Sequence, residues 1–181
     1  LHLDTKKLGR INKIGHRITG NPRDHSRGIG WEYLHVCIDD HSRLATSELD
    51  ADENGETAAR FLERAVAYYR RFGVTVQRVM TDNGSCYLSN AFRNACQRLQ
   101  IRHLRTRPYT PKTNGKAERF IQSALREWAY AHAYHHSKER AATLPLWLHR
   151  YNWHRPHHSL GMNPPISRLA LTADNLVRHH S

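Results

Sequence analysis

One acidic residue stands in each of three stretches, Leu1-His2-Leu3-Asp4-Thr5, Thr81-Asp82-Asn83-Gly84 and Asn114-Gly115-Lys116-Ala117-Glu118-Arg119. Each acid lies where a strand, turn or helix is predicted to begin or end. Thirty-five residues separate Asp82 from Glu118. Carboxylates from separate elements are the hard oxygen ligands that divalent metal ions need for phosphoryl transfer. The three acids are therefore a candidate catalytic site.

Alternation of hydrophobic residues predicts the strands. Leu1 and Leu3 alternate with His2 and Asp4, as expected for a strand whose two faces differ. The same pattern, or a short β-branched run, predicts five strands in all, at residues 1–8, 31–38, 44–49, 74–81 and 101–104. Asp39 and Asp40 fall in a turn between the second and third strands, so we assign them to the turn and not to the site.

Capping residues and helical spacing predict four helices. Asn54 caps the first, which Gly73 ends, and Ser89 caps the second. The third begins near Thr113 or Asn114 and places Glu118 at the margin between its buried and wet faces. Thr143 and Pro145 are predicted to open the fourth helix.

Before the fourth helix, the resulting order is three strands, helix, strand, helix, strand, helix. Residues 9–30, rich in glycine and arginine, are predicted to form a long basic hairpin or loop. We expect residues 1–135 to form a catalytic core and residues 136–181 a helical and extended tail packed on it. Because the chain begins at Leu1 on a motif-bearing strand, we expect it to be part of a longer protein.

The chain is strongly basic. Its 181 residues include 28 Lys and Arg against 16 Asp and Glu, a formal charge of +12 and a pI near 10.1. Such a balance favours a polyanionic partner, with nucleic acid the first choice, although a merely basic surface is the alternative.

The other titratable residues favour neither a disulfide framework nor a zinc site. The three cysteines are odd in number and lack paired spacing, and the fifteen histidines lack cysteine partners at zinc-finger spacing. No apolar run is long enough to cross a membrane. We expect a protein of the reducing cytosol, associated with nucleic acid.

Each acid has a structural alternative. Asp4 could be an exposed strand-end charge, Asp82 a turn residue, and Glu118 a partner of the helix dipole. Together they fit two-metal phosphodiester chemistry better, because two ions can activate the nucleophile and hold the leaving oxygen. Without an ion, carboxylates a few ångströms apart would repel by roughly 1 to 4 kcal/mol per pair.

Longer motifs surround the three acids. These are Pro108-Tyr109-Thr110-Pro111-Lys112-Thr113-Asn114-Gly115-Lys116-Ala117-Glu118-Arg119, Tyr151-Asn152-Trp153-His154-Arg155-Pro156-His157-His158-Ser159-Leu160, and Pro164-Pro165. Taken together with the three acids, these motifs resemble the DDE transposase and retroviral-integrase-like superfamily. The tail of the sequence resembles bacterial insertion-sequence transposases. The resemblance implies an α/β, RNase H-like fold with a mixed five-stranded sheet flanked by helices.

The resemblance also implies a function. It assigns Asp4, Asp82 and Glu118 as catalytic metal ligands for Mg²⁺ or Mn²⁺, with two ions expected. The implied activity is cleavage of mobile-element DNA ends and transfer of their 3′-hydroxyls into target DNA, by a homo-oligomer on DNA. The alternatives are an RNase H-like nuclease that only hydrolyses and an inactive DNA-binding module.

The DNA contacts cannot be copied from retroviral relatives. Those relatives place lysines one and two turns beyond the glutamate, where this chain has Gln122 and Leu125. The residues that we expect to contact DNA are Lys6, Lys7, Arg10, Lys112, Asn114, Lys116 and Arg119. For Arg126, a solvated helix face explains the residue as well as a DNA contact does. Arg155 either contacts DNA or attaches the tail to the core.

Overall fold

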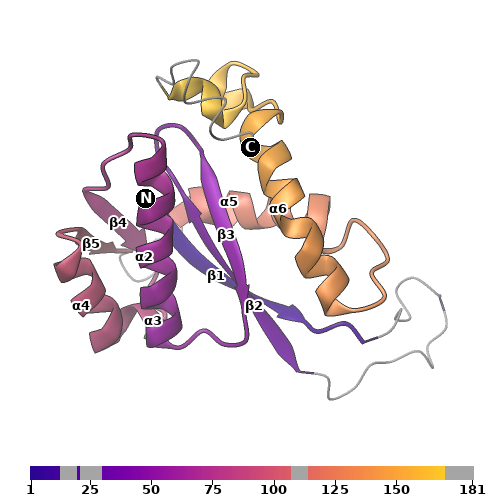
Figure 1. The fold of residues 1–181 in the computed structure, drawn as a ribbon, viewed down its shortest axis with the longest axis horizontal. Coiled ribbons are helices and arrows are strands. Elements are labelled where there is room, and N and C mark those ends of the chain that lie inside the picture. Colours follow the sequence, from indigo (N-terminus) through magenta and orange to yellow (C-terminus); the bar gives the residue numbers. More distant parts are fainter. Residues whose placement is uncertain (13–19, 21–29, 107–113, 170–181) are drawn as a thin grey trace.

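The computed structural model describes residues 1–12, 20, 30–106 and 114–169, and centres on one five-stranded sheet (Figure 1). The strand order is β3-β2-β1-β4-β5. The strands are β1 (His2–Gly9), β2 (Trp31–Ile38), β3 (Ala45–Asp50), β4 (Arg78–Thr81) and β5 (Arg102–Arg105). β1, β2 and β3 pair antiparallel, whereas β1, β4 and β5 pair parallel. The predicted mixed five-stranded sheet is therefore confirmed.

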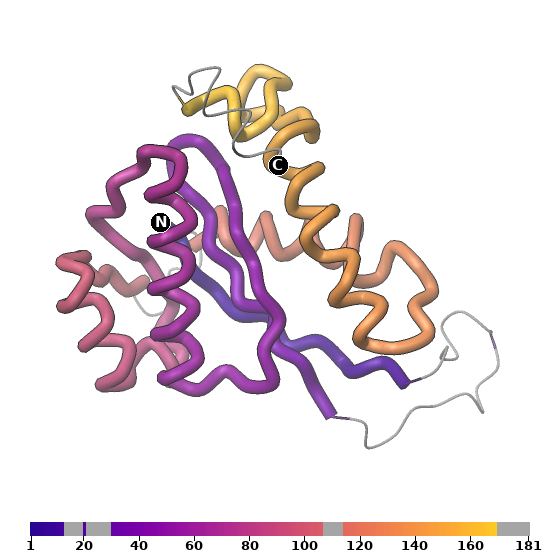
Figure 2. Tube along the Cα trace, in the orientation of Figure 1, coloured from indigo at the N-terminus to yellow at the C-terminus, as the bar shows by residue number. Residues whose placement is uncertain are grey.

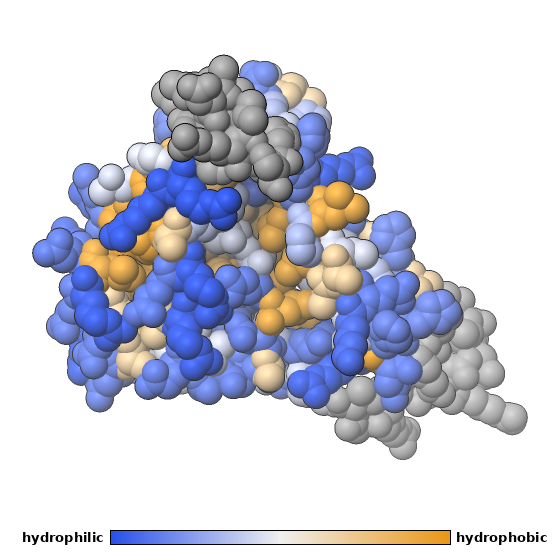
Figure 3. Space-filling model, in the orientation of Figure 1, coloured by the Kyte–Doolittle hydropathy of each residue, from blue (hydrophilic) through white to orange (hydrophobic). Residues whose placement is uncertain are grey.

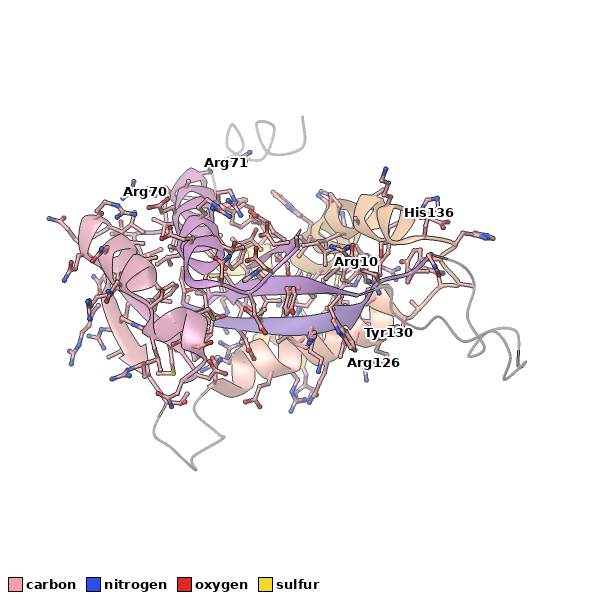
Figure 4. The ribbon with its side chains drawn as sticks, turned by 90° about the horizontal axis from the view of Figure 1, so that it is seen from below. Arg10, Arg70, Arg71, Arg126, Tyr130 and His136 are labelled. Carbon is pink, nitrogen blue, oxygen red and sulfur yellow. The ribbon has the colours of Figure 1, made fainter. Side chains whose placement is uncertain are left out.

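Helices cover both faces of this sheet. The helical elements are α2 (Gly55–Arg71), α3 (Ser85–Leu88), α4 (Asn90–Arg98), α5 (Gly115–Ala124), the π-helix η2 (Leu125–Ala129), α6 (Ser137–Trp153), η3 (His158–Leu160) and η4 (Pro165–Arg168). Figure 4 shows α2 and α5 on opposite sides of the sheet. Leu3 packs in the core cluster on the α2 side and Leu8 in the cluster on the α5 side, as the alternation along β1 predicts.

The predicted caps of α2 and α4 are present. The Asn54 side chain accepts a hydrogen bond from the Thr57 amide at 2.9 Å, and the Ser89 hydroxyl accepts one from the Phe92 amide at 3.1 Å. Gly73, just beyond α2, has a φ of +74°, a conformation that glycine adopts without steric cost.

Three boundaries differ from the prediction. α6 begins at Ser137 and holds Pro145 inside it, because His136 caps it by accepting the Glu139 amide at 3.1 Å. Histidine is outside the usual set of capping residues, so the sequence signal favoured Thr143 instead. β4 begins at Arg78, four residues later than predicted, and the short helix α3 was not predicted.

The C-terminal helix shares a core with the rest of the chain. Leu144, Trp147 and Tyr151 of α6 belong to the cluster that contains Phe120 and Trp128. The Asn152 side chain accepts a hydrogen bond from the Ala45 amide at 2.9 Å and donates one to the Ala45 carbonyl at 2.7 Å, which ties α6 to β3. Figure 2 shows the chain continuing from α6 to the short segment that ends the described residues.

An apolar groove of about 230 Å³ separates α2 from α6. Figure 3 shows hydrophobic side chains at the surface on this face, between the hydrophilic surfaces of the two helices. Across the described ranges, no helix has the length and hydropathy needed to span a bilayer. The three cysteines are buried and free. The predicted hairpin at 9–30 lies largely outside the described residues.

Candidate active site

Asp4 lies on β1, and Asp82 directly follows the end of β4, the neighbouring parallel strand. His2 of β1 lies opposite Met80 of β4, and each acid lies two residues further along its strand direction. Neighbouring strands are about 4.8 Å apart, and residues two apart share a face. The register therefore brings the two predicted acids, far apart in the sequence, to the same part of the sheet.

Glu118 lies in the first turn of α5, and Asn114 holds the start of that helix against β1. The Asn114 side chain donates to the Leu3 carbonyl at 2.9 Å, and its oxygen is 3.2 Å from His2 Nδ1. Both bonds attach the helix to the residues immediately before Asp4. The first turn of α5 is consequently fixed beside the strand that carries the first acid.

The electrostatics of Asp4 indicate that the three carboxylates are neighbours. The pKa of Asp4 is raised to about 6, chiefly by burial and also by the charges of Asp82 and Glu118. A hydrogen bond from the Thr5 amide at 2.7 Å and the charge of Lys6 act in the opposite direction. The ionised form of Asp4 is thus disfavoured in the absence of a compensating cation.

The donor chemistry fits a divalent metal ion, but the side chains are not all directed at one point. Asp82 Oδ1 accepts the Gly84 amide at 2.8 Å, and both Asp82 and Glu118 are exposed. Within the described ranges, no three His, Cys, Asp or Glu side chains form a group that could hold a metal ion. Binding an ion between all three carboxylates would require Asp82 and Glu118 to rotate toward Asp4. Their exposure leaves room for that rotation.

A polar network supports the site from the opposite face of the sheet. Thr5 Oγ1 is 3.1 Å from His35 Nδ1 and 3.0 Å from the Tyr87 hydroxyl. His35 is fully buried, and its Nε2 is 3.1 Å from the Asp52 carbonyl. The network joins β1 and β2 to α3, the helix that follows Asp82. Sequence reasoning missed these residues, because only the register that pairs Thr5 with His35 places them on one face.

Two of the predicted DNA contacts on α5 are constrained by protein partners. Lys116 Nζ forms an ion pair with Asp40, whose pKa is lowered chiefly by that hydrogen bond. Asn114 is buried and both ends of its amide bond to β1, so it is a positioning residue and the expectation of a DNA contact there is corrected. Arg119 is exposed. Lys112 lies outside the described residues.

The predicted contacts on β1 are accessible. Lys6, Lys7 and Arg10 are all exposed, and Lys7 Nζ lies 4.5 Å from the centre of the Trp31 ring. Figure 4 shows Arg10 at the end of the sheet opposite to the one near α3. Together these residues mark a basic path along β1 away from Asp4.

The turn acids and the tail arginine have structural partners. Asp39 Oδ2 accepts hydrogen bonds from both the amide and the hydroxyl of Ser42 at 2.7 Å, which confirms its assignment to the turn. Arg155 donates to both carboxylate oxygens of Glu127, at 2.8 and 3.0 Å. This pair fastens the tail to η2.

Comparison with known families decides the assignment. A family model described as "Integrase core domain" matches residues 16–111, and a second with the same description matches residues 99–165. The chain belongs to the integrase core domain family. The predicted family resemblance is therefore confirmed, and Asp4, Asp82 and Glu118 lie on the elements of this integrase core domain where the sequence placed them.

Sequence relatives come from both bacteria and retroviruses. The integrase core domain is 32% identical over 127 residues to the transposase InsD for insertion element IS2A/D/F/H/I/K of Escherichia coli, covering 67% of this chain and 41% of that protein. It is 34% identical over 88 residues to the Gag-Pro-Pol polyprotein of Mason-Pfizer monkey virus, covering 49% of this chain and 5% of that protein. The chain thus spans less than half the length of these two relatives.

Solved structures confirm the RNase H-like fold. The catalytic core domain of BIV integrase matches 99% of this chain and 94% of that chain, with a TM-score of 0.59 and 18% identity. A chain of the simian T-cell lymphotropic virus intasome in complex with PP2A regulatory subunit B56 gamma matches with a TM-score of 0.67 and 20% identity. That match covers 95% of this chain and 55% of the other.

Proposed function

We propose that this integrase core domain is the catalytic core of a transposase that cleaves DNA ends and joins their 3′-hydroxyls to target DNA. The observation that carries the proposal is the strand register, which brings Asp4 and Asp82 to the same part of the sheet, and the raised pKa of Asp4, to which the charges of Asp82 and Glu118 contribute, also supports it. The three carboxylates would hold Mg²⁺ or Mn²⁺. When bound, such ions would supply Lewis-acid activation of the attacking oxygen and charge neutralisation at the leaving oxygen.

The residues of the chain provide position and charge. Asp4 is held by the Thr5 amide of β1, and Asp82 by the Gly84 amide in the turn between β4 and α3. Lys6 lies two residues beyond Asp4, on the same face of β1, where a cation can attract a phosphate toward the acids. The nucleophile is water or a DNA hydroxyl, and no protein nucleophile is required.

DNA is the proposed substrate. Lys6, Lys7, Arg10, Lys112, Lys116 and Arg119 are the proposed phosphate contacts, and they account for much of the net charge of +12. Joining two ends of one mobile DNA segment requires two active sites, so we propose that the protein acts as a homo-oligomer on DNA. Lys116 would exchange Asp40 for a phosphate when DNA binds.

A strand-transfer assay tests the proposal. The protein is incubated with Mn²⁺, a target plasmid and a labelled duplex that carries a pre-cut end of the mobile element encoding it. Joined product from the wild type supports transposition, whereas hydrolysis alone supports the RNase H-like nuclease. DNA binding without either product supports the inactive module.

Matched variants assign the chemistry to the acids. Asp82→Asn and Glu118→Gln are expected to lose at least about a hundredfold in joining, because each removes a metal ligand. Glu63→Gln is the control, since it also neutralises one acid but lies on α2 in an exposed pair with Arg98. Wild-type activity in either site variant would remove that acid from the site.

A further inference from the structure

A basic cavity lies between α5 and the segment that follows α6. Its volume is about 610 Å³, and it is lined in part by Arg43, Lys116, Arg119, Arg126, Arg155 and His157. No acidic residue is among the described residues that line it. Asp40 and Glu127, outside the lining, pair with four of these cations, but two acids against five lysine and arginine side chains leave a net positive charge, which attracts an anion.

Two nitrogen atoms of this cavity are buried without a hydrogen-bond partner. They are Arg43 Nη1 and His157 Nε2. Asp40 lies 3.5 Å from Arg43 Nη1 as an ion pair, but it does not complete a hydrogen bond. Buried polar atoms that lack a partner cost free energy, and most are satisfied in native structures. An oxygen-rich anion in the cavity would satisfy the guanidinium nitrogen once the Arg43 side chain turns toward it.

The electrostatic environment of His157 also favours an anion in the cavity. The pKa of His157 is lowered to about 4, chiefly by burial and also by the positive charges of Arg155 and Arg43, against the smaller opposing effect of Glu127. The same cations that disfavour a protonated imidazole favour an anion at this position.

The cavity follows one flank of α5. Lys116, Arg119, Ser123 and Arg126 recur at the spacing of one helix face, and Glu118 does not share that face. Gly115, at the start of α5, also lines the cavity, and a side-chain carbon added there would meet no atom within 4 Å. His157 and residues of η3 line it from the segment that follows α6.

We propose that this cavity binds the sugar-phosphate backbone of the DNA on which the protein acts, with Arg119, Arg43 and His157 as contacts. The inference rests on the proposed function, because it takes DNA as the substrate. It adds a path that runs along α5 to the tail segment, in addition to the basic residues of β1.

DNA binding without metal tests this path separately from catalysis. Fluorescence anisotropy with a labelled mixed-sequence duplex in EDTA gives the affinity of the 181-residue chain at several salt concentrations. The Arg43→Gln/Arg119→Gln double variant is expected to bind roughly tenfold or more weakly, and its log–log salt slope should fall by about 2, one for each lost phosphate contact. Arg70→Gln is the control, an exposed arginine on α2 that Figure 4 shows on the opposite side of the sheet from Arg126.

A second variant adds charge without removing any contact. Ser159 is exposed and lines the cavity, so Ser159→Glu places an acid in the path and should weaken DNA binding several-fold. Asn94→Glu adds the same charge to an exposed position of α4 and should leave the affinity within about twofold of wild type. Thermal melting confirms that each variant is folded.

The outcomes separate the inference from the proposed function. Weaker binding in both cavity variants, with unchanged controls, supports the path whether or not the protein joins DNA. Binding that is the same in Ser159→Glu as in Asn94→Glu, with an unchanged salt slope in the arginine double variant, overturns it even if strand transfer is active.

Discussion

Replacing Asp4 by asparagine should stabilise the metal-free protein, and should do so only above the acidic range. The pKa of Asp4 is raised from 3.8 to about 6, so its folded state holds a proton more tightly than its unfolded state. The stabilising contribution of the protonated carboxyl is fully present below about pH 4 and is lost as the pH rises through about 6. The neutral side chain of the Asp4→Asn variant would keep an acceptor for the Thr5 amide at every pH.

The size of the expected stabilisation by Asp4→Asn follows from the pKa shift of Asp4. A change of about 2 pKa units corresponds to an upper limit of about 3 kcal/mol, and solvent screening of a half-buried carboxylate reduces this to about 1 to 2 kcal/mol. Urea denaturation in EDTA at several values between about pH 4 and about pH 8 gives the free energy of unfolding of both proteins. The difference between Asp4→Asn and wild type should be near zero at about pH 4 and grow to this value by about pH 7.

Asp40→Asn is a control in which the expected change in stability has the opposite sign. The Lys116 hydrogen bond holds the pKa of Asp40 below its usual value, so Asp40→Asn should lose stability relative to wild type above about pH 4. A difference between Asp4→Asn and wild type that does not change with pH would refute the reasoning. It would mean that Asp4 is not held in an unfavourable, carboxylate-rich environment.

Three further substitutions test the frame that carries the site, each by urea denaturation at neutral pH. Asn152→Ala should lower the free energy of unfolding by about 2 to 3 kcal/mol, because it removes two hydrogen bonds and leaves the Ala45 amide and carbonyl without these partners. A loss below about 0.5 kcal/mol would contradict the role of these two hydrogen bonds. Gly73→Ala should cost about 1 kcal/mol, since φ is +74° there, and a gain in stability would show a different backbone conformation. Arg140→Met should lower the free energy of unfolding by about 3 kcal/mol, because the fully buried Arg140 guanidinium is 2.7 Å from Glu32, and the substitution leaves Glu32 without this partner. An unchanged stability would show that Glu32 is solvated instead.

Much of the fold follows from local sequence patterns. Alternation in residues 1–8 and 31–38 predicts both the strands and their inward faces, because side chains on a strand alternate strictly. Asn54, Gly73 and Ser89 mark helix ends through the hydrogen bonds and backbone angles that those residue types favour. The start of α6 was not predictable in this way, since it depends on a histidine cap and on packing of Trp147 against Phe120.

Of the candidate site, the sequence alone pointed to the three acids and not to the residues that position them. Local patterns identify Asp4, Asp82 and Glu118 as candidates, but their convergence depends on a parallel register between strands that are far apart in the sequence. The positioning role of Asn114 and the pairing of Lys116 with Asp40 also arise from long-range contacts. Single-residue preferences contain no information about such pairs.

The most direct test of the central claim is a crystal structure of the protein soaked in Mn²⁺, with data collected at the manganese absorption edge. The account predicts an anomalous peak within about 2 to 2.5 Å of carboxylate oxygens from Asp4 and Asp82, with Glu118 turned toward it. The same crystals of Asp82→Asn should lose that peak. A saturating soak that places manganese elsewhere, or leaves Asp4, Asp82 and Glu118 without a shared ion, would contradict the assignment of these acids as the catalytic centre.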